Sequence, residues 1–522
     1  MRRGPLVLLA IGAACLLTLS TGTGGQDRES QTGSRPMIPK TWDEAALADW
    51  ATPIAGLNVQ PSHMSEKEYY DLRVENLRTY PVYFPGHEPQ GYWEMLQQVG
   101  PRPLIEPEKL KSDADWIEAG RRVFDEVDDL HLRTYDPKLI VAARNRATFD
   151  AAGTQPYPDG TLDGIRWVPT ERGVALSVAN CKNCHSLTLP DGSRVPGAPT
   201  FARVSRTERF KYLNPLILQI HAANRVTATA TPFIMGSGPF GMRLYQAFGV
   251  PWVKDDIHDR LKSATPDQVR EITEIALSGG ALPRWNGSPF YPTKIPDLIG
   301  IRDRKYIDHT ATHLHRGIGD LMRYAALVSF AESIDFGPYH VILADTKRVE
   351  ARLPDEALYA LALYLRSLQP PPNPNPFDDR AQAGRKIFER EGCVMCHTPP
   401  LYTSNKLTLA SGFAPPEDKP GTLDVLPLSV GTDAGLALKT RKGTGYYKVP
   451  SLKGVWYRGH YLHDGSVASL EEMFDPDRVK ETHVPGGWSP PGTKTWAIKG
   501  HPFGLSLRPD ERTQLIAFLR TL

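Results

Sequence analysis

Residues 382–398 of this 522-residue chain read QAGRKIFEREGCVMCHT. The stretch opens with a helix-like pattern and runs directly into a Cys-x-x-Cys-His motif at Cys393–His397. The same motif occurs once more, as CKNCH, at Cys181–His185. The two motifs contain four of the five cysteines, and the fifth, Cys15, lies near the N-terminus. The sequence is therefore organised around a cysteine motif that occurs twice.

Three kinds of chemistry compete as explanations of these motifs. A thioredoxin-type redox pair needs no following histidine, and a four-thiolate zinc site joining both pairs leaves both histidines unexplained. Covalent c-type haem accounts for every residue, because two cysteines at this spacing reach the two vinyl groups on one porphyrin edge and the adjacent histidine supplies an axial imidazole to iron. The sequence therefore predicts two covalently bound c-type haems. The predicted attachment residues and proximal iron ligands are Cys181, Cys184, Cys393, Cys396, His185 and His397.

Composition limits the kinds of partner. Lys plus Arg total 61 and Asp plus Glu total 59, which leaves a formal net charge of +2. This balance gives no support to a nucleic-acid partner. A hydrophobic content of 40% suffices for packed cores, and the length is sufficient for two to four domains.

The N-terminus has the pattern of a secretory signal, predicted over residues 1–25. Arg2 and Arg3 precede the apolar stretch PLVLLAIGAACLLTL, and small and polar residues follow it. The apolar stretch is short for a membrane span, which needs about 20 residues. An uncleaved anchor and a lipoprotein modified at Cys15 are the alternatives. We expect a periplasmic or secreted protein without a stable membrane span.

Three further segments occur in pairs, each in the same order around a haem motif. The pairs are AGRRVF (119–124) with AGRKIF (383–388), KIPDLIGIRDRKYIDH (294–309) with KVPSLKGVWYRGHYLH (448–463), and PDEALYALALYLRSL (354–368) with PDERTQLIAFLRTL (509–522). The middle pair aligns at a constant offset of 154 residues. Either the first or the last pair alone could be explained by two generic amphipathic helices. Because all the paired segments occur in the same order in both halves, tandem domains are favoured.

The predicted fold is mainly α-helical, with two tandem cytochrome c-like haem domains, long loop insertions and an N-terminal extension. Cys393 lies nine positions after Gly384, whereas Cys181 lies 61 positions after Gly120, so the first unit carries an insertion before its haem motif. The predicted boundaries are a signal peptide at 1–25, an extension at 26–111, a first haem domain at 112–368, a Pro-rich linker at 369–376 and a second haem domain at 377–522.

The second half resembles the superfamily of di-haem cytochrome c peroxidases and MauG. The resemblance is carried by GRKIFEREGCVMCHT, VPSLKGVWYRGHYLHDGSVASLEEMF and FGLSLRPDERTQLIAFLRTL, and it covers residues 380–522 well and 112–368 in outline. The long region before the first haem motif and the wide haem spacing resemble the rubber-oxygenase branch of this superfamily. Calcium remains open as an additional cofactor.

The resemblance implies that the C-terminal haem transfers electrons and has a second protein ligand shortly before the final helix. The stretch WAIKGHPFGLSL offers His501 at that place. Met473 in LEEMF and His463 in the HDGS segment are the alternatives. Bis-histidine ligation would give a lower reduction potential than histidine–methionine ligation.

The resemblance also implies that the N-terminal haem is the reactive one. Where the peroxidases have a bridging tryptophan, this sequence has Tyr306, so Trp285 is the nearest substitute. His309, in the histidine-rich stretch DHTATHLHR, is a candidate distal base, and Glu332 is a candidate acid–base carboxylate for cleaving the O–O bond of a peroxide. The predicted catalytic residues are therefore Glu332, His309 and Trp285.

Three functions are compatible with these features. The first is a peroxidase-type oxidoreductase that takes electrons from a small redox protein and reduces hydrogen peroxide. The second is a haem-dependent oxygenase that cleaves an organic substrate with dioxygen, in the manner of the rubber oxygenases. The third is a di-haem carrier that only transfers electrons. The resemblance favours the first.

Overall fold

The computed structural model describes eleven parts of the chain, and everything below refers to them: 36–52, 65–127, 133–150, 154–178, 181–200, 281–282, 291–330, 351–417, 421, 423–439 and 443–522. The predicted signal segment, 1–25, lies outside these residues. Within the described ranges, no helix is both long enough and apolar enough to cross a membrane.

Helices form both ends of each predicted unit and strands lie between them. The helices are α1 (Glu44–Leu47), α2 (Glu66–Asp71), α3 (Tyr92–Val99), α4 (Asp113–Glu126), α5 (Pro137–Ala142), α6 (Arg146–Asp150), α7 (Cys181–Cys184), α14 (Ile318–Phe330), α15 (Asp355–Ser367), α16 (Asp379–Arg390), α17 (Gly435–Leu438), α18 (Val455–Arg458), α19 (Leu470–Met473) and α20 (Pro509–Arg520). Short 3₁₀ helices are η1 (Pro107–Lys109), η3 (Ile301–Asp303), η6 (Cys393–Met395) and η7 (Pro476–Val479). The strands are β1 (Arg73–Val74), β2 (Tyr80–Tyr83), β3 (Arg133–Thr134), β4 (Thr161–Thr170), β5 (Gly173–Val178), β6 (Ser186–Thr188), β7 (Arg194–Pro196), β8 (Ala281–Leu282), β9 (Thr293–Lys294), β10 (Ala351–Arg352), β11 (Leu407–Leu409), β12 (Val425–Ser429) and β13 (Tyr446–Lys448).

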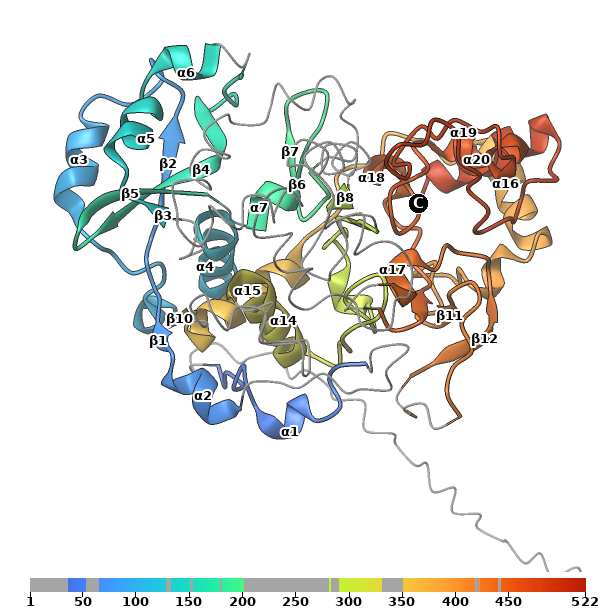
Figure 1. Ribbon diagram of the computed structural model, residues 1–522, viewed down its shortest axis with the longest axis horizontal. Coiled ribbons are helices and arrows are strands. Elements are labelled where there is room, and N and C mark those ends of the chain that lie inside the picture. The colour runs from blue at the N-terminus through green and yellow to red at the C-terminus, as the bar shows by residue number, and fades with distance from the viewer. Residues whose placement is uncertain are drawn as a thin grey trace, which may run out of the picture.

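Helix α4 begins the core of the first half. Ser112 and Asp115 form a capping box, in which the Ser112 hydroxyl accepts from the Asp115 N–H (3.2 Å) and the Asp115 carboxylate accepts from the Ser112 N–H (2.9 Å). The buried face of α4, which includes Trp116, Val123 and Phe124, packs against α15, and α15 packs in turn against α14. These three helices lie together at the centre of the molecule (Figure 1).

The closest helix contact of the first half recurs in the second half. A Cβ atom placed on Gly120 of α4 would lie 1.9 Å from the carbonyl oxygen of Ala360 in α15. A Cβ atom on Gly384 of α16 would lie 1.9 Å from the carbonyl oxygen of Gln514 in α20. In both pairs, glycine lets two backbones approach more closely than any side chain allows. The two matched sequence segments, AGRRVF and AGRKIF, therefore make the same contact with the helix that ends each half.

An antiparallel sheet, absent from the sequence-based prediction, lies beside the helical core of the first half. Its strand order is β2-β4-β5-β3, and a two-residue turn joins β4 to β5. Trp167 of β4 is opposite Leu176 of β5, and both side chains are fully buried. Strand β2 belongs to the predicted N-terminal extension, whereas β4 and β5 belong to the predicted insertion. These two regions therefore fold together, with α3, α5 and α6 around the sheet (Figure 1).

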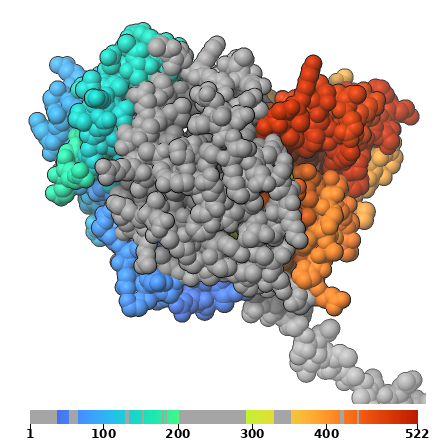
Figure 2. Space-filling model, viewed as in Figure 1, coloured from blue at the N-terminus to red at the C-terminus, as the bar shows by residue number. Residues whose placement is uncertain are grey.

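The N-terminal and C-terminal parts of the chain occupy opposite sides of the molecule (Figure 2). The C-terminal side contains α16, α20 and the small sheet β12-β11-β13. On the other side, the extension also supports the helical core, because Trp42 and Trp50 are fully buried in the same cluster as α4 and α15. A parallel pair, β1 with β10, joins the extension to the segment just before α15.

Candidate haem-binding sites

The second Cys-x-x-Cys-His motif follows α16 almost directly. Gly392 takes a left-handed conformation (φ 73°) that turns the chain from α16 into η6. The His397 N–H then donates to the Cys393 carbonyl (2.9 Å), and the Ser404 N–H donates to the Cys396 carbonyl (2.7 Å). These bonds fold the motif into one compact turn, which brings both sulfur atoms and the histidine to the same cavity.

His397 is held in an orientation that suits a metal ligand. Its Nδ1 lies 3.2 Å from the Tyr402 carbonyl oxygen, which leaves Nε2 for a metal. The side chain is buried, and burial lowers its pKa to about 4, so the imidazole is neutral at pH 7. A neutral imidazole is the form that binds iron.

His501 faces His397 across the same cavity. The two ring centres are 6.3 Å apart, which is close to twice the distance from a ring centre to a metal when each metal–nitrogen bond is about 2.0 Å. Burial lowers the pKa of His501 to about 3, and its buried Nδ1 has no hydrogen-bond partner among the described residues. His501 also takes a left-handed backbone conformation (φ 56°), which is uncommon outside glycine.

A fully buried arginine, Arg478, holds the backbone around His501. It donates to the carbonyl oxygens of Gly500 (3.0 Å), His501 (2.6 Å) and Ile498, and its Nε donates to the Met473 carbonyl (2.9 Å). Burial lowers the pKa of Arg478 from its ordinary value. Because these bonds fix the carbonyl of His501 itself, Arg478 stabilises the unusual conformation that directs the imidazole toward His397.

The cavity between the two histidines fits a haem. Its volume is about 440 Å³, within the range typical of small-molecule and cofactor sites. Both cysteines of the motif, both histidines and apolar residues of α20 line it. The rival ligands Met473 and His463 line it too, but the His463 ring packs on Tyr447, with ring centres 4.7 Å apart. Cys393 and Cys396 would therefore bind a porphyrin through thioether bonds, and His397 and His501 would hold its iron.

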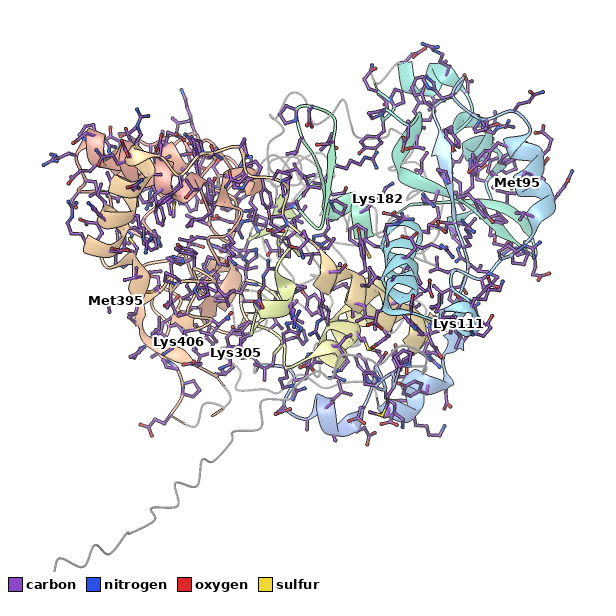
Figure 3. The ribbon with its side chains drawn as sticks, turned by 180° about the vertical axis from the view of Figure 1, so that it is seen from behind. Met95, Lys111, Lys182, Lys305, Met395 and Lys406 are labelled. Carbon is purple, nitrogen blue, oxygen red and sulfur yellow. The ribbon has the colours of Figure 1, made fainter. Side chains whose placement is uncertain are left out.

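The first motif has the same local hydrogen bonds in different surroundings. The His185 N–H donates to the Cys181 carbonyl (3.1 Å), and the Thr200 N–H donates to the Cys184 carbonyl (3.0 Å). Cys181 packs against the core cluster that contains Phe124 of α4, and burial raises its pKa to about 12. None of the four cysteines in the two motifs forms a disulfide. Figure 3 labels Lys182 of the first motif and Met395 of the second, which lie in different halves of the molecule.

Two of the three predicted catalytic residues, Glu332 and Trp285, lie outside the described residues. The third, His309, lines the cavity of the second motif, and its Nε2 lies 3.0 Å from the Lys294 carbonyl. Burial lowers its pKa well below the ordinary value. Of its neighbours in the histidine-rich stretch, His313 packs on Trp50 with ring centres 4.2 Å apart. A group of three or more His, Cys, Asp or Glu side chains suited to a metal ion does not occur in the described part of the chain.

Sequence reasoning missed a set of cations in the wall of the second cavity. Lys294, Arg304, Lys448 and Arg458 all line it. They come from the paired segments 294–309 and 448–463, where Lys294 corresponds to Lys448 and Arg304 to Arg458 at the offset of 154 residues. The alignment of the two segments contained this signal, but it did not show that all four side chains face one cavity.

In a comparison with curated proteins, the chain is similar to cytochrome-c peroxidases and to MauG. No protein-family model matches the sequence. The chain is 29% identical over 196 residues to the cytochrome-c peroxidase IdrP1 of Denitromonas iodatirespirans, covering 32% of this chain and 49% of that protein. It is 29% identical over 147 residues to the methylamine utilization protein MauG of Methylorubrum extorquens, covering 27% of this chain and 34% of that protein. The chain spans about half the length, or less, of the curated relatives it matches.

Among solved structures, the similarities are weaker. A MauG-like protein associated with microbial copper homeostasis aligns with a TM-score of 0.29 at 18% identity, over 44% of this chain and 75% of that one. Hydrazine synthase of Kuenenia stuttgartiensis aligns with a TM-score of 0.26 at 18% identity, over 45% of this chain and 73% of that one. The chain is thus similar to a cytochrome-c peroxidase and to MauG, and this similarity agrees with its resemblance to the superfamily of di-haem cytochrome c peroxidases and MauG.

Proposed function

We propose that this protein is an exported di-haem c-type oxidoreductase of the peroxidase type. In this proposal, two cytochrome c-like units, 112–368 and 377–522, each bind one haem covalently through their Cys-x-x-Cys-His motif. The matching positions of Gly120 and Gly384, where an added Cβ atom would in each case lie 1.9 Å from a backbone oxygen, support the pairing of the units. Electrons enter at the C-terminal haem from a small redox protein and pass to the N-terminal haem, where hydrogen peroxide is reduced.

The observation that carries the proposal is the facing pair His397 and His501, with ring centres 6.3 Å apart. When bound, haem supplies one-electron redox chemistry and, where an axial position is open, a site for peroxide. His397 and His501 would fill both axial positions of the second haem and exclude an outside ligand. Arg478 would keep His501 in place during changes of redox state. The second site is therefore suited to electron transfer, and substrate chemistry is assigned to the first.

The first site must supply a proton to the oxygen that leaves when the O–O bond of a peroxide breaks. Glu332 remains the proposed acid–base group for that step, and Trp285 the proposed relay between the sites. His309 is less suited to the first site than to the second, because its ring hydrogen-bonds to Lys294 in the wall of the second cavity.

One observation favours an oxygenase as a second candidate. Strand β5 ends at Val178, just before Cys181, so the sheet built by the extension and the insertion leads directly into the first motif. That sheet adds a second packed core, around Trp167 and Phe149, to the first half. Such additional structure next to the proposed reactive site would suit an organic substrate larger than peroxide.

The test uses the purified holoprotein, produced in a host that attaches c-type haem. We expect two covalent haems per chain, a second haem that is low-spin throughout, and a first haem that becomes high-spin when the second is reduced. Hydrogen peroxide should then oxidise the reduced protein, with sustained turnover when a small reduced cytochrome is supplied. Oxidation should be measured by stopped-flow absorbance.

Three other outcomes would contradict the proposal. Low-spin iron at both haems in every redox state would indicate a carrier without a substrate site. Dioxygen uptake with cleavage of an organic compound, and no turnover of peroxide, would indicate the oxygenase. A chain that binds no covalent haem at all would contradict each of these functions.

A further inference from the structure

The paired segments 294–309 and 448–463 meet each other through reciprocal hydrogen bonds. The Lys294 N–H donates to the His463 carbonyl (2.7 Å), and the Lys448 N–H donates to the His309 carbonyl (3.0 Å). Each lysine is the first residue of its segment, and each histidine is the last. The two segments therefore contact each other in a reciprocal way, and this contact is called the repeat junction below.

Each segment also folds on itself in the same way. Gly300 and Gly454 occupy equivalent positions and have left-handed φ angles of 72° and 78°. Arg304 then bonds back to the carbonyl of Asp297, and Arg458 bonds back to the equivalent carbonyl of Ser451. Both arginines are thus turned toward the repeat junction by the same local structure.

The repeat junction gathers positive charge on one wall of the second cavity. Four cations line the cavity, namely Lys294, Arg304, Lys448 and Arg458, whereas Asp297 is the only carboxylate among the described residues that line it. Like charges collected in a buried place repel one another unless anions are present.

The protein itself leaves one of these cations without a hydrogen bond. Lys448 donates to the Ile307 carbonyl (2.7 Å). Lys294 lies near the Tyr461 ring, 5.9 Å from its centre, but its ammonium group has no hydrogen bond or ion pair with any described residue. Burial, followed by the charge of Arg458, lowers the pKa of Lys294 to about 7. An anion in the cavity would restore the charged form.

The other residues of the cavity identify that anion. Cys393 and Cys396 would bind the vinyl edge of a porphyrin, and His397 and His501 would hold its iron. The opposite edge of a haem has two carboxylates, and these need cationic or hydrogen-bonding partners when they are buried. A small carboxylate or phosphate from solution has the same chemistry, but the covalent haem is always present.

We propose that the repeat junction is a binding site for the two carboxylates of the haem attached at Cys393 and Cys396, with Lys294 as a cation supplied from the first half of the chain. This inference rests on the proposed function only in requiring a haem at the second motif. The haem then joins the two halves, because the first repeat binds one end of a group that is covalently attached to the second half.

The test is the reduction potential of the second haem in Lys294→Gln, measured by spectroelectrochemistry on the holoprotein. Removing a positive charge near the porphyrin favours the ferric state, so we expect the ratio of oxidised to reduced haem at a fixed potential to rise about tenfold, a shift of about 59 mV. Since the ammonium group of Lys294 donates no hydrogen bond to a described residue, and the backbone bond to His463 is kept, this variant should fold normally. Lys294→Arg retains the charge, so its ratio of oxidised to reduced haem should remain within about threefold of the wild-type ratio.

Lys406→Gln is the matched control. Lys406 and Lys305 lie close together at the surface (Figure 3), and both pair with Asp424, at 3.7 Å and 3.8 Å. Removing Lys406 therefore takes away one positive charge outside the cavity while Asp424 keeps a partner. The ratio of oxidised to reduced second haem at a fixed potential should change by less than twofold.

Three results would overturn the proposal. An unchanged potential in Lys294→Gln, in a protein with full haem content, would remove the carboxylate site and leave the proposed function standing. Saturable binding of phosphate or acetate to the wild type, lost in Lys294→Gln, would assign the junction to a free anion. Absence of covalent haem at the second motif would contradict both this site and the proposed function. Calorimetric titration and haem analysis of the same samples separate these results from one another.

Discussion

The two Cys-x-x-Cys-His motifs have the same backbone hydrogen bonds, and they differ in the structure that lies next to them. In each, the histidine N–H donates to the carbonyl of the first cysteine, at 3.1 Å in the first motif and 2.9 Å in the second. The second motif follows α16 within a few residues, whereas the sheet strands β4 and β5 stand between α4 and the first motif. The two motifs are therefore alike in the backbone that would hold a porphyrin, and they differ in the structure that precedes each motif.

The difference extends to the second iron ligand. The second cavity contains His501, held by Arg478 directly across from His397. For the first motif, residues 201–280, which follow it in the sequence, lie outside the described part of the chain, so its second ligand stays a matter of prediction. The comparison therefore predicts that the two haem sites have similar motif backbones and different surroundings. The variants below test either the similarity or the difference.

The largest effect should come from removing either cysteine pair. Replacing Cys181 and Cys184 by serine, or Cys393 and Cys396 by serine, should leave one covalent haem per chain instead of two, because we propose that each pair attaches its own porphyrin. Haem content per chain, from the pyridine haemochrome spectrum, measures this. If the four thiolates shared one metal, each double variant would instead lose the whole cofactor.

The next effect should be a change of spin state at the second haem alone. His501→Ala removes the proposed ligand and should convert that haem from low-spin to high-spin, since one axial position opens. Electron paramagnetic resonance at low temperature distinguishes the two states. Met473→Leu is the matched variant, because it keeps the volume of the rival ligand and should leave the spectrum unchanged. The reverse pattern would assign the ligand to Met473.

These sites show which parts of the structure the sequence predicts. The haem motifs follow from a local pattern, since two cysteines and a histidine at fixed spacing have one good chemical explanation. The candidate His501 came instead from the family resemblance, which implies a ligand shortly before the final helix. The close contacts of α4 and α16 follow from matched segments that contain Gly120 and Gly384. Local signals of this kind need no knowledge of distant residues.

The sheet of the first half was not predicted, and the reason is physical. Strand β2 contains Pro81, and β4 contains Gly164 and Pro169, residues that weaken a strand pattern. The pairing of β2 with β4 places Tyr80 opposite Trp167, and these two residues are far apart in the sequence. Strand preference depends on such partners more than on the strand itself. The cation cluster was missed for a related reason, because facing one cavity is a property of the repeat junction and not of either segment alone.

The third effect concerns stability and tests whether the two halves share the same close helix contact. Gly120→Ala and Gly384→Ala each place a methyl group 1.9 Å from a backbone oxygen, so the helices of each pair must separate. We expect a loss of about 3 kcal/mol of unfolding free energy in each case, measured by thermal unfolding. Gly317→Ala is the control, because no atom lies within 4 Å of the added carbon. A large loss in one half only would argue against the matched packing.

The smallest effect tests a difference between the two repeats. Asp308 in the first repeat corresponds to Leu462 in the second at the offset of 154 residues. Burial acts to raise the pKa of Asp308, but His313, the Thr312 N–H (2.8 Å) and Lys448 together lower it to about 2. The folded-state pKa thus lies below the ordinary value of about 3.9.

A carboxyl group whose pKa falls on folding stabilises the protein above its ordinary pKa, and this contribution is lost as the pH falls through the folded-state value. Asp308→Asn should therefore cost about 2 kcal/mol of unfolding free energy at pH 7, and the difference from the wild type should shrink between pH 4 and pH 2. Thermal unfolding over that interval measures it. Asp303→Asn, an exposed carboxylate of the same repeat, should change stability by less than about 0.5 kcal/mol. If Asp308→Asn were equally destabilising at every pH, the loss would lie in packing, and the first repeat would have no acid-sensitive feature that the second lacks.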